Sequence, residues 1–117
     1  MQIAIIDTDP EACDILAQLF EFKGDVCSRL NEHSGLREQL AIFIPDVVIV
    51  SVEMNPIYWS AIVAAIRGSV PVKPIKVVAL SGWDLERYKD DAKGAGFDFY
   101  FCKPVAFAEL YATVLDR

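Results

Sequence analysis

The sequence predicts a single α/β domain in which a parallel sheet carries helices on both faces. Five short apolar segments alternate along the chain with five segments that have helical length or helical periodicity. The third apolar segment contains an unbroken β-branched run from Val47 to Val50, which is typical of a strand covered on both faces. The connections between the segments are short, as expected for successive βα units.

The composition is that of one compact domain spanning residues 1–117. Of the 117 residues, 54% are hydrophobic and 24% are charged, so the chain can bury a core and is not disordered. The net charge of -6 argues against nucleic acid as a direct partner. No apolar run reaches the roughly 18 uncharged residues that a membrane helix needs, so we expect no membrane partner and a cytoplasmic location. Cys13, Cys27 and Cys102 are widely spaced, and we expect them to be reduced and buried.

The first βα unit is the most clearly marked by its sequence. An apolar strand is expected over 2–6, and Asp9 is expected to cap the helix that begins at Pro10. Gly24 is expected to end this helix in a left-handed conformation. Spacings of three and four predict that its buried face consists of Ala12, Ile15, Leu16, Leu19 and Phe20.

The middle of the chain contains the strand around which the rest is organised. We expect an edge strand over 25–30, then a short helix that begins near Ser34, and then a buried strand over 46–52. The segment 57–67 has helical length but is apolar almost all round, which indicates either deep burial or cover by a partner.

The remaining units follow the same alternation. Strands are expected over 75–80 and 97–101, and Asp84 is expected to cap the helix between them, which ends at Gly94 and Gly96. The last helix is expected to bury one stripe, formed by Phe107, Leu110, Tyr111, Val114 and Leu115. Five parallel strands with five helices favour a flavodoxin-like order, 2-1-3-4-5.

Polar residues follow four of the five expected strands. In this type of sheet, sites form outside the carboxyl ends of the strands. Carboxylates, hydroxyls and one lysine are suited to binding an oxyanion together with a hard cation. The residues that we expect at this edge are Asp7, Thr8 and Asp9 after the first strand, Ser51 and Glu53 after the third, Ser81 after the fourth and Lys103 after the fifth.

The motifs at these strand ends resemble those of response-regulator receiver domains, the CheY-like modules of two-component signalling. The resemblance covers essentially the whole chain, and it rests on the order and spacing of four motifs. These are Ile5-Ile6-Asp7-Thr8-Asp9-Pro10, the segment from Pro45-Asp46 to Ser51, Ala79-Leu80-Ser81-Gly82 and Tyr100-Phe101-Cys102-Lys103-Pro104.

The resemblance implies a role for each matching position. Receivers hold Mg²⁺ with two acidic residues after the first strand, of which the second ligates the metal directly. Asp7 matches the first of these residues, whereas Thr8 occupies the position of the second. Ser51 occupies the position of the aspartate that accepts a phosphoryl group from a histidine kinase. Glu53 matches the residue that offers a backbone carbonyl to the metal.

The family positions after the fourth and fifth strands match this sequence better than the metal-binding and acceptor positions do. Ser81 matches the hydroxyl residue that contacts the phosphoryl group, and Tyr100 matches the aromatic switch residue. Lys103 matches the lysine that pairs with the phosphoryl oxygens and precedes a cis proline, here Pro104. Pro56 lies five residues past Ser51 instead of the usual four, which suggests a longer loop.

Because Thr8 and Ser51 replace carboxylates of the family pattern, the groups that would form an aspartyl phosphate are missing from these positions. A carboxylate attacks phosphorus without losing a proton, whereas the Ser51 hydroxyl must lose one. The one histidine, His33, is expected in a solvated loop after the second strand and not among these residues. We therefore expect no cofactor, and Mg²⁺ binding at Asp7 that is weak or absent. Lys103 is then expected to form a structural ion pair with Asp7.

These residues favour a pseudo-receiver, which is not an enzyme and which acts by binding other signalling proteins, as a homodimer or within a larger parent protein. Two partner surfaces are considered: the fourth helix with the fifth strand and fifth helix, and the apolar helix around Trp59 and Ile62. One alternative is an active receiver with a displaced acceptor at Glu53 or Asp9. Another is a small-anion site formed by Ser51, Ser81 and Lys103.

Overall fold

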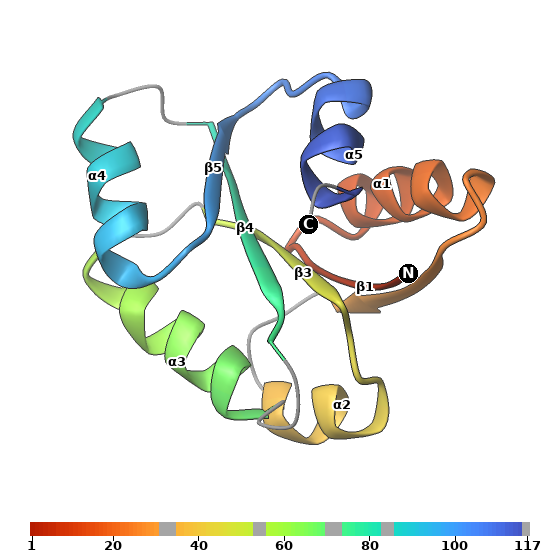
Figure 1. Cartoon of the computed structure of the whole chain (residues 1–117), viewed down its shortest axis with the longest axis horizontal. Helices are drawn as coiled ribbons and strands as arrows, with labels where there is room; N and C mark the ends of the chain where they lie inside the picture. Colours follow the sequence, from red (N-terminus) through yellow and green to blue (C-terminus); the bar gives the residue numbers. More distant parts are fainter. Residues whose placement is uncertain (31–34, 53–55, 70–73, 83–85, 116–117) are drawn as a thin grey trace.

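The computed structural model describes residues 1–30, 35–52, 56–69, 74–82 and 86–115. Five parallel strands form one sheet in the order β2-β1-β3-β4-β5, which confirms the predicted fold (Figure 1). The strands are β1 (Gln2–Ile6), β2 (Val26–Leu30), β3 (Val47–Ser51), β4 (Lys76–Ser81) and β5 (Phe99–Cys102). The helices are α1 (Pro10–Phe22), α2 (Leu36–Ile42), α3 (Trp59–Ser69), α4 (Glu86–Ala95) and α5 (Phe107–Leu115), with a 3-10 turn, η1 (Pro56–Tyr58), before α3.

The helices cover the sheet in two layers. Helices α1 and α5 lie on one face, and α2, α3 and α4 lie on the other (Figure 1). Alternate strand residues enter the two cores: Ile3 and Ile5 pack with α1 and α5, whereas Ala4 and Ile6 pack with the other three helices. Both faces of the sheet are therefore buried, as the continuous apolar strands predict.

Strand β3 lies at the centre of this arrangement. All five of its residues are buried, and it pairs with β1 on one side and β4 on the other. Ser51 is its last residue, in register with Leu80 of β4. The chain order reverses between β1 and β3, and the carboxyl ends of strands at such a switch point are where sites form in α/β sheets.

The ends of α1 agree with the prediction, but its buried face does not. The Asp9 carboxylate accepts hydrogen bonds from the backbone N–H groups of Glu11 and Ala12, and Gly24 has a φ of 94° after the helix. The buried residues are Cys13, Ala17 and Phe20, while Ile15 and Leu19 are exposed. The prediction was right for Phe20, and Leu16 packs partly buried against the same core, but it was wrong for Ile15 and Leu19. The small side chains of Cys13 and Ala17 pack on the sheet in their place.

Helix α3 is a core helix. Its buried residues are Trp59, Ile62, Val63 and Ile66, and Trp59 is fully buried. The Trp59 ring lies 6.2 Å from each of the rings of Tyr88, Phe97 and Tyr100. A partner surface centred on Trp59 and Ile62 is thereby excluded, because both side chains are already covered by the domain itself.

Several smaller differences concern boundaries and caps. Strand β5 begins at Phe99, two residues later than expected, and Phe97 instead packs in the core. Gly94 lies within α4, and Gly96, with a φ of 106°, follows its end. The expected caps at Ser34 and Asp84, His33 and the longer loop before Pro56 lie outside the described residues.

The cysteines are unpaired, as expected, although only Cys13 is fully buried; Cys27 and Cys102 are partly buried. Within the described ranges, no helix is long and apolar enough to cross a membrane.

Candidate functional site

Polar side chains are buried at the carboxyl edge of the sheet. Among the described residues, the buried polar or charged residues are Asp7 after β1, Ser51 at the end of β3 and Ser81 at the end of β4. Lys103 follows β5 at the same edge. Buried polar groups are costly unless they are hydrogen-bonded, so their collection at one edge indicates a built site and not a solvated surface.

Lys103 joins the ends of three strands. Its ammonium group donates a hydrogen bond to Ser51 Oγ at 2.5 Å and lies 4.0 Å from Asp7 Oδ2. Its backbone N–H donates to the carbonyl oxygen of Ser81 at 2.7 Å, and the Lys103-Pro104 bond is cis, as the family pattern implies. The hydroxyl of Ser51 is thus the nearer side-chain partner of Lys103, and the expected ion pair with Asp7 is the longer contact.

Asp7 is held in place by the backbone. Its Oδ1 atom accepts a hydrogen bond from the backbone N–H of Asp9 at 2.9 Å, and its own N–H donates to the carbonyl of Leu30 at 2.9 Å. One carboxylate oxygen is therefore used by the turn that starts α1, while the other faces Lys103. This arrangement explains why a buried carboxylate is tolerated here: backbone and lysine groups replace part of its hydration.

Of the seven residues that match the family pattern, the structure brings four together at this edge: Asp7, Ser51, Ser81 and Lys103. Thr8 follows β1 at the same edge but is exposed. Tyr100 is partly buried and packs against Trp59. Glu53 lies outside the described residues. Each of the four comes directly at or after the end of a parallel strand, which sets its location at this edge.

Cys13 is a neighbour of the site that the sequence did not reveal. Its thiol donates to the carbonyl oxygen of Ile5, one strand residue from the end of β1. Burial, and to a smaller extent the charge of Asp7, raise the pKa of this thiol. A neutral thiol is therefore expected here, which is consistent with its place in the core under α1.

The described residues at this edge offer few of the ligands that Mg²⁺ prefers. Mg²⁺ requires near-octahedral oxygen ligation, usually with one or two carboxylates. At this edge the described residues provide the Asp7 carboxylate, already bonded to Asp9, together with hydroxyl groups and the positive charge of Lys103. Among all the residues that the structure describes, no group of three or more His, Cys, Asp or Glu side chains could hold a metal ion.

Comparison with known proteins agrees with this geometry. The family model for the response regulator receiver domain matches residues 3–115. The chain belongs to this family. A curated relative, an uncharacterized 14.6 kDa protein in the sodA1 3′ region of Leptolyngbya boryana, is 24% identical over 114 residues, which cover 97% of this chain and 87% of the relative.

Solved receiver structures share the fold. A two-component response regulator from Clostridium difficile superposes with a TM-score of 0.84 at 21% identity, covering 97% of this chain and 92% of that chain. The BeF3-activated receiver domain of Klebsiella pneumoniae RstA gives a TM-score of 0.83 at 18% identity, covering 98% of this chain and 96% of that one. The family assignment thus gives this receiver domain a place in two-component signalling, and the chemistry of its own site has to be argued from its residues.

Proposed function

We propose that this receiver domain acts as a cytoplasmic, non-enzymatic module that binds other signalling proteins and is not phosphorylated on aspartate. The observation that carries the proposal is Ser51 at the end of β3, hydrogen-bonded to Lys103. The family resemblance places the phosphoacceptor carboxylate at this position, and here a neutral hydroxyl stands instead.

The local chemistry supports the loss of acceptor function. Ser51 would need a general base to release its proton, and its nearest described partner is a lysine ammonium, which is a donor and not a base. Thr8 replaces the second acidic residue, so that Asp7 is the remaining described carboxylate that could contact Mg²⁺. A phosphoryl group arriving here would therefore meet neither a nucleophile nor a well-ligated metal.

The alternatives receive less support. The Asp9 carboxylate already caps α1, with its Oδ1 atom 3.0 Å from the N–H of Glu11, so using it as an acceptor would uncap the helix. A small-anion site at Ser51, Ser81 and Lys103 would place the anion beside the Asp7 carboxylate, which repels it. Whether Glu53 acts as a displaced acceptor is decided by the experiment described next.

The test is a titration of the domain with Mg²⁺, with and without beryllofluoride, in which the backbone amide chemical shifts are monitored by NMR. We expect no saturable change in the natural sequence. The matched control is the double variant Thr8→Asp/Ser51→Asp, which restores both carboxylates and is expected to show saturable, Mg²⁺-dependent shifts. A saturable response of the natural sequence that Glu53→Gln abolishes would refute the proposal and identify a displaced acceptor.

A further inference from the structure

A groove lies between helices α3 and α4, which pack side by side on the same face of the sheet (Figure 1). It encloses about 450 Å³. One wall is formed by η1 and the first turn of α3, with Ile57 and Ser60, and the other wall is formed by α4, with Asp90, Asp91 and Gly94. The groove has no residue in common with the candidate site at the carboxyl edge of the sheet.

The wall on the α3 side is apolar. Ile57 and Tyr58 are 74% and 61% exposed, and Ala61 and Ala64 continue the exposed face along α3. No charged residue occurs from 56 to 66. Neighbouring exposed apolar side chains on an uncharged segment are typical of an interaction surface, whereas isolated ones are not. The small alanine side chains also allow the backbone of a partner to come close.

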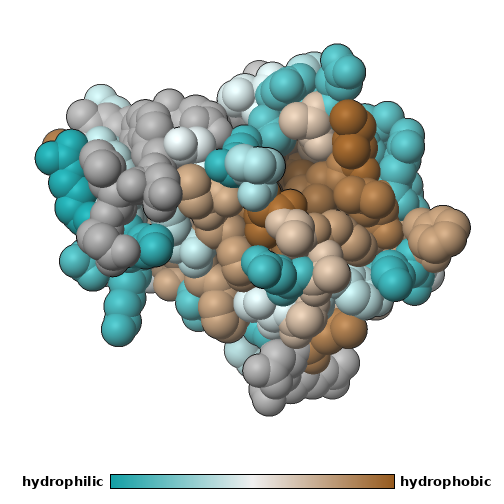
Figure 2. Space-filling view, turned by 90° about the horizontal axis from the view of Figure 1, so that it is seen from above, coloured by the Kyte–Doolittle hydropathy of each residue, from teal (hydrophilic) through white to brown (hydrophobic). Residues whose placement is uncertain are grey.

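The charges of α4 are segregated by sign. Asp90 and Asp91 line the groove toward α3, whereas Lys89 and Lys93 line a separate hollow against β5. Figure 2, which views the molecule from above, shows hydrophilic side chains along the left margin, where α4 lies, and apolar ones in the half where α1 and α5 lie. The side of α4 that faces the groove is therefore negative and attracts a positively charged partner.

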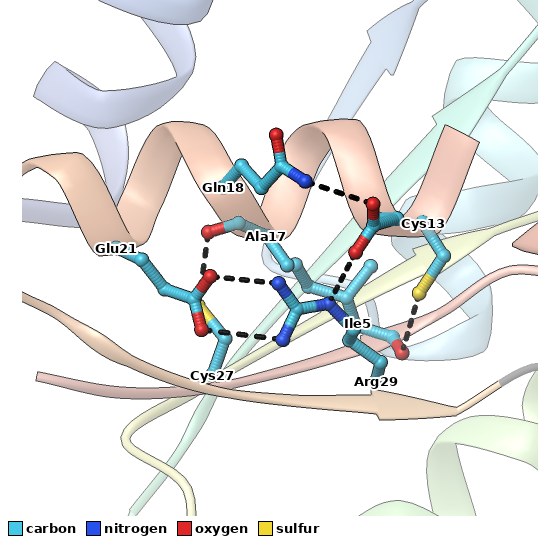
Figure 3. Close-up of polar contacts among 8 residues, drawn as sticks. Ile5, Cys13, Ala17, Gln18, Glu21, Cys27 and Arg29 are labelled. Atoms are coloured by element: carbon cyan, nitrogen blue, oxygen red, sulfur yellow. Dashed lines mark hydrogen bonds and ion pairs between the residues drawn. The ribbon is translucent and has the colours of Figure 1, made fainter. Parts of the chain in front are cut away.

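The Asp90 carboxylate is available to such a partner. It forms no hydrogen bond or ion pair in the part of the chain that the structure describes. Asp91 lies one helical turn from Arg87, which partly balances its charge. On α1, in contrast, Arg29 contacts both carboxylate oxygens of Glu21, at 2.7 and 3.2 Å (Figure 3). A cation would have to displace Arg29 from Glu21, whereas it meets no such competitor at Asp90.

Two glycines beside the groove differ in what the fold requires of them. Gly96 has a φ of 106°, and a Cβ atom there would lie 3.0 Å from Cγ1 of Val63 on α3. Gly94 lies in the last turn of α4, and a Cβ atom there would have no neighbour within 4 Å. Glycine is less favourable than alanine in a helix, by up to about 1 kcal/mol. Packing inside the domain thus explains Gly96 but not Gly94, whereas the close approach of a partner to α4 explains Gly94.

We propose that the groove between α3 and α4 binds an amphipathic helix of another signalling protein. Its apolar face lies on Ile57 and Ala61, and its Lys or Arg side chains lie beside Asp90 and Asp91. A helix fits better than an extended peptide, because the walls are helices with internally paired backbones and would leave the backbone of an extended peptide unpaired. The inference rests on the proposed function, since it names the surface and the kind of partner, but it does not depend on the chemistry at the carboxyl edge of the sheet.

The test is an NMR titration of the isotope-labelled domain with two helical peptides of equal length. Both peptides have about 16 residues, leucine and alanine on one face, and a hydrocarbon staple, because short helices are unstable alone. One carries lysine on its other face, and the second carries glutamate. We expect the lysine peptide to bind with a Kd of about 10 to 500 μM and to shift the amide signals of η1, α3 and α4. Added salt should weaken this binding, and the glutamate peptide should not bind.

A charge reversal tests the acidic wall. Asp90→Lys should weaken binding of the lysine peptide about tenfold or more, because it places a like charge in the groove. The matched control is Glu109→Lys, since Glu109 is also exposed but lies on α5, on the opposite face of the sheet. It changes the net charge equally and should alter the Kd by less than about twofold. Equal losses in both variants would indicate general attraction to an acidic domain and would overturn the proposal.

A larger side chain at Gly94 tests the shape of the groove. Gly94→Leu fills the groove without disturbing the core, because its Cβ atom meets no neighbour within 4 Å. It should weaken binding about tenfold or more, whereas Ala108→Leu, at an exposed position on α5, should not. Thermal unfolding of every variant verifies that the fold is kept. An unchanged Kd for Gly94→Leu, or amide shifts that map outside η1, α3 and α4, would overturn the proposal.

The peptide titration and the beryllofluoride titration can fail independently. A domain that binds neither the lysine peptide nor beryllofluoride would overturn the groove proposal alone. A saturable response to beryllofluoride in a domain that binds the lysine peptide in the groove would overturn the proposed loss of phosphorylation alone.

Discussion

The contact between Lys103 and Ser51 is the feature of the site whose energy can be measured most directly. The hydrogen bond joins an ammonium group to the hydroxyl of a buried residue at 2.5 Å, whereas the Asp7 carboxylate lies 4.0 Å from the same ammonium group. Hydrogen bonds to charged groups contribute about 1.5 to 3 kcal/mol. Ion pairs at the limit of contact and partly exposed to water contribute about 0 to 1 kcal/mol.

We therefore predict different coupling energies for the two pairs in double-mutant cycles. The first cycle combines Lys103→Met with Ser51→Ala, and the second combines Lys103→Met with Asp7→Asn. Methionine keeps most of the apolar stem of lysine and removes the charge, so lost packing contributes little. The expected coupling is about 1.5 kcal/mol in the first cycle and less than about 1 kcal/mol in the second.

The assay is urea denaturation, with unfolding monitored by circular dichroism. With an m-value of about 2 kcal/mol/M, a coupling of 1.5 kcal/mol corresponds to a difference of about 0.7 M in the midpoints around the first cycle. Equal m-values in all variants are needed for the comparison. A larger coupling for Asp7 than for Ser51 would refute the reasoning, because it would mean that Lys103 is held by the carboxylate and that the hydroxyl is incidental.

Two further predictions concern α1 and the cysteine beside it. Phe20 is fully buried and Phe22 is 89% exposed. Phe20→Ala should therefore lower the free energy of unfolding by about 3 to 5 kcal/mol and Phe22→Ala by less than about 0.5 kcal/mol, at concentrations where the domain is monomeric; similar losses would mean that α1 is packed differently. Burial raises the pKa of Cys27 to about 11, which favours the neutral thiol in the folded state. The stability that this thiol contributes is complete below the pKa of an unfolded cysteine and is lost as the pH rises toward 11. Cys27→Ala should thus make the free energy of unfolding fall less steeply at alkaline pH, and an unchanged slope would contradict the raised pKa.

Much of this domain follows from local sequence signals. The continuous apolar strands determine the parallel sheet, because only a sheet covered on both faces buries every side chain of Val47 to Val50. Asp9 and Pro10 mark the start of α1, since capping depends on neighbouring backbone groups. The cluster of Asp7, Ser51, Ser81 and Lys103 could also be predicted, because residues at the ends of parallel strands meet at one edge whatever the details of packing.

Other features were decided by the tertiary structure. Periodicity placed Ile15 and Leu19 inward, but α1 has two apolar faces, and the small Cys13 and Ala17 beside Phe20 are the residues that pack on the sheet. Helix α3 is apolar almost all round, so its sequence could not say that Trp59 is enclosed by Tyr88, Phe97 and Tyr100. In the same way, the order of the strands predicted that Lys103 shares one sheet edge with Ser51 and Asp7. Only the positions of three separate strands decided that Ser51 lies nearer to it than Asp7, because such contacts depend on ångström-scale distances between segments far apart in the chain.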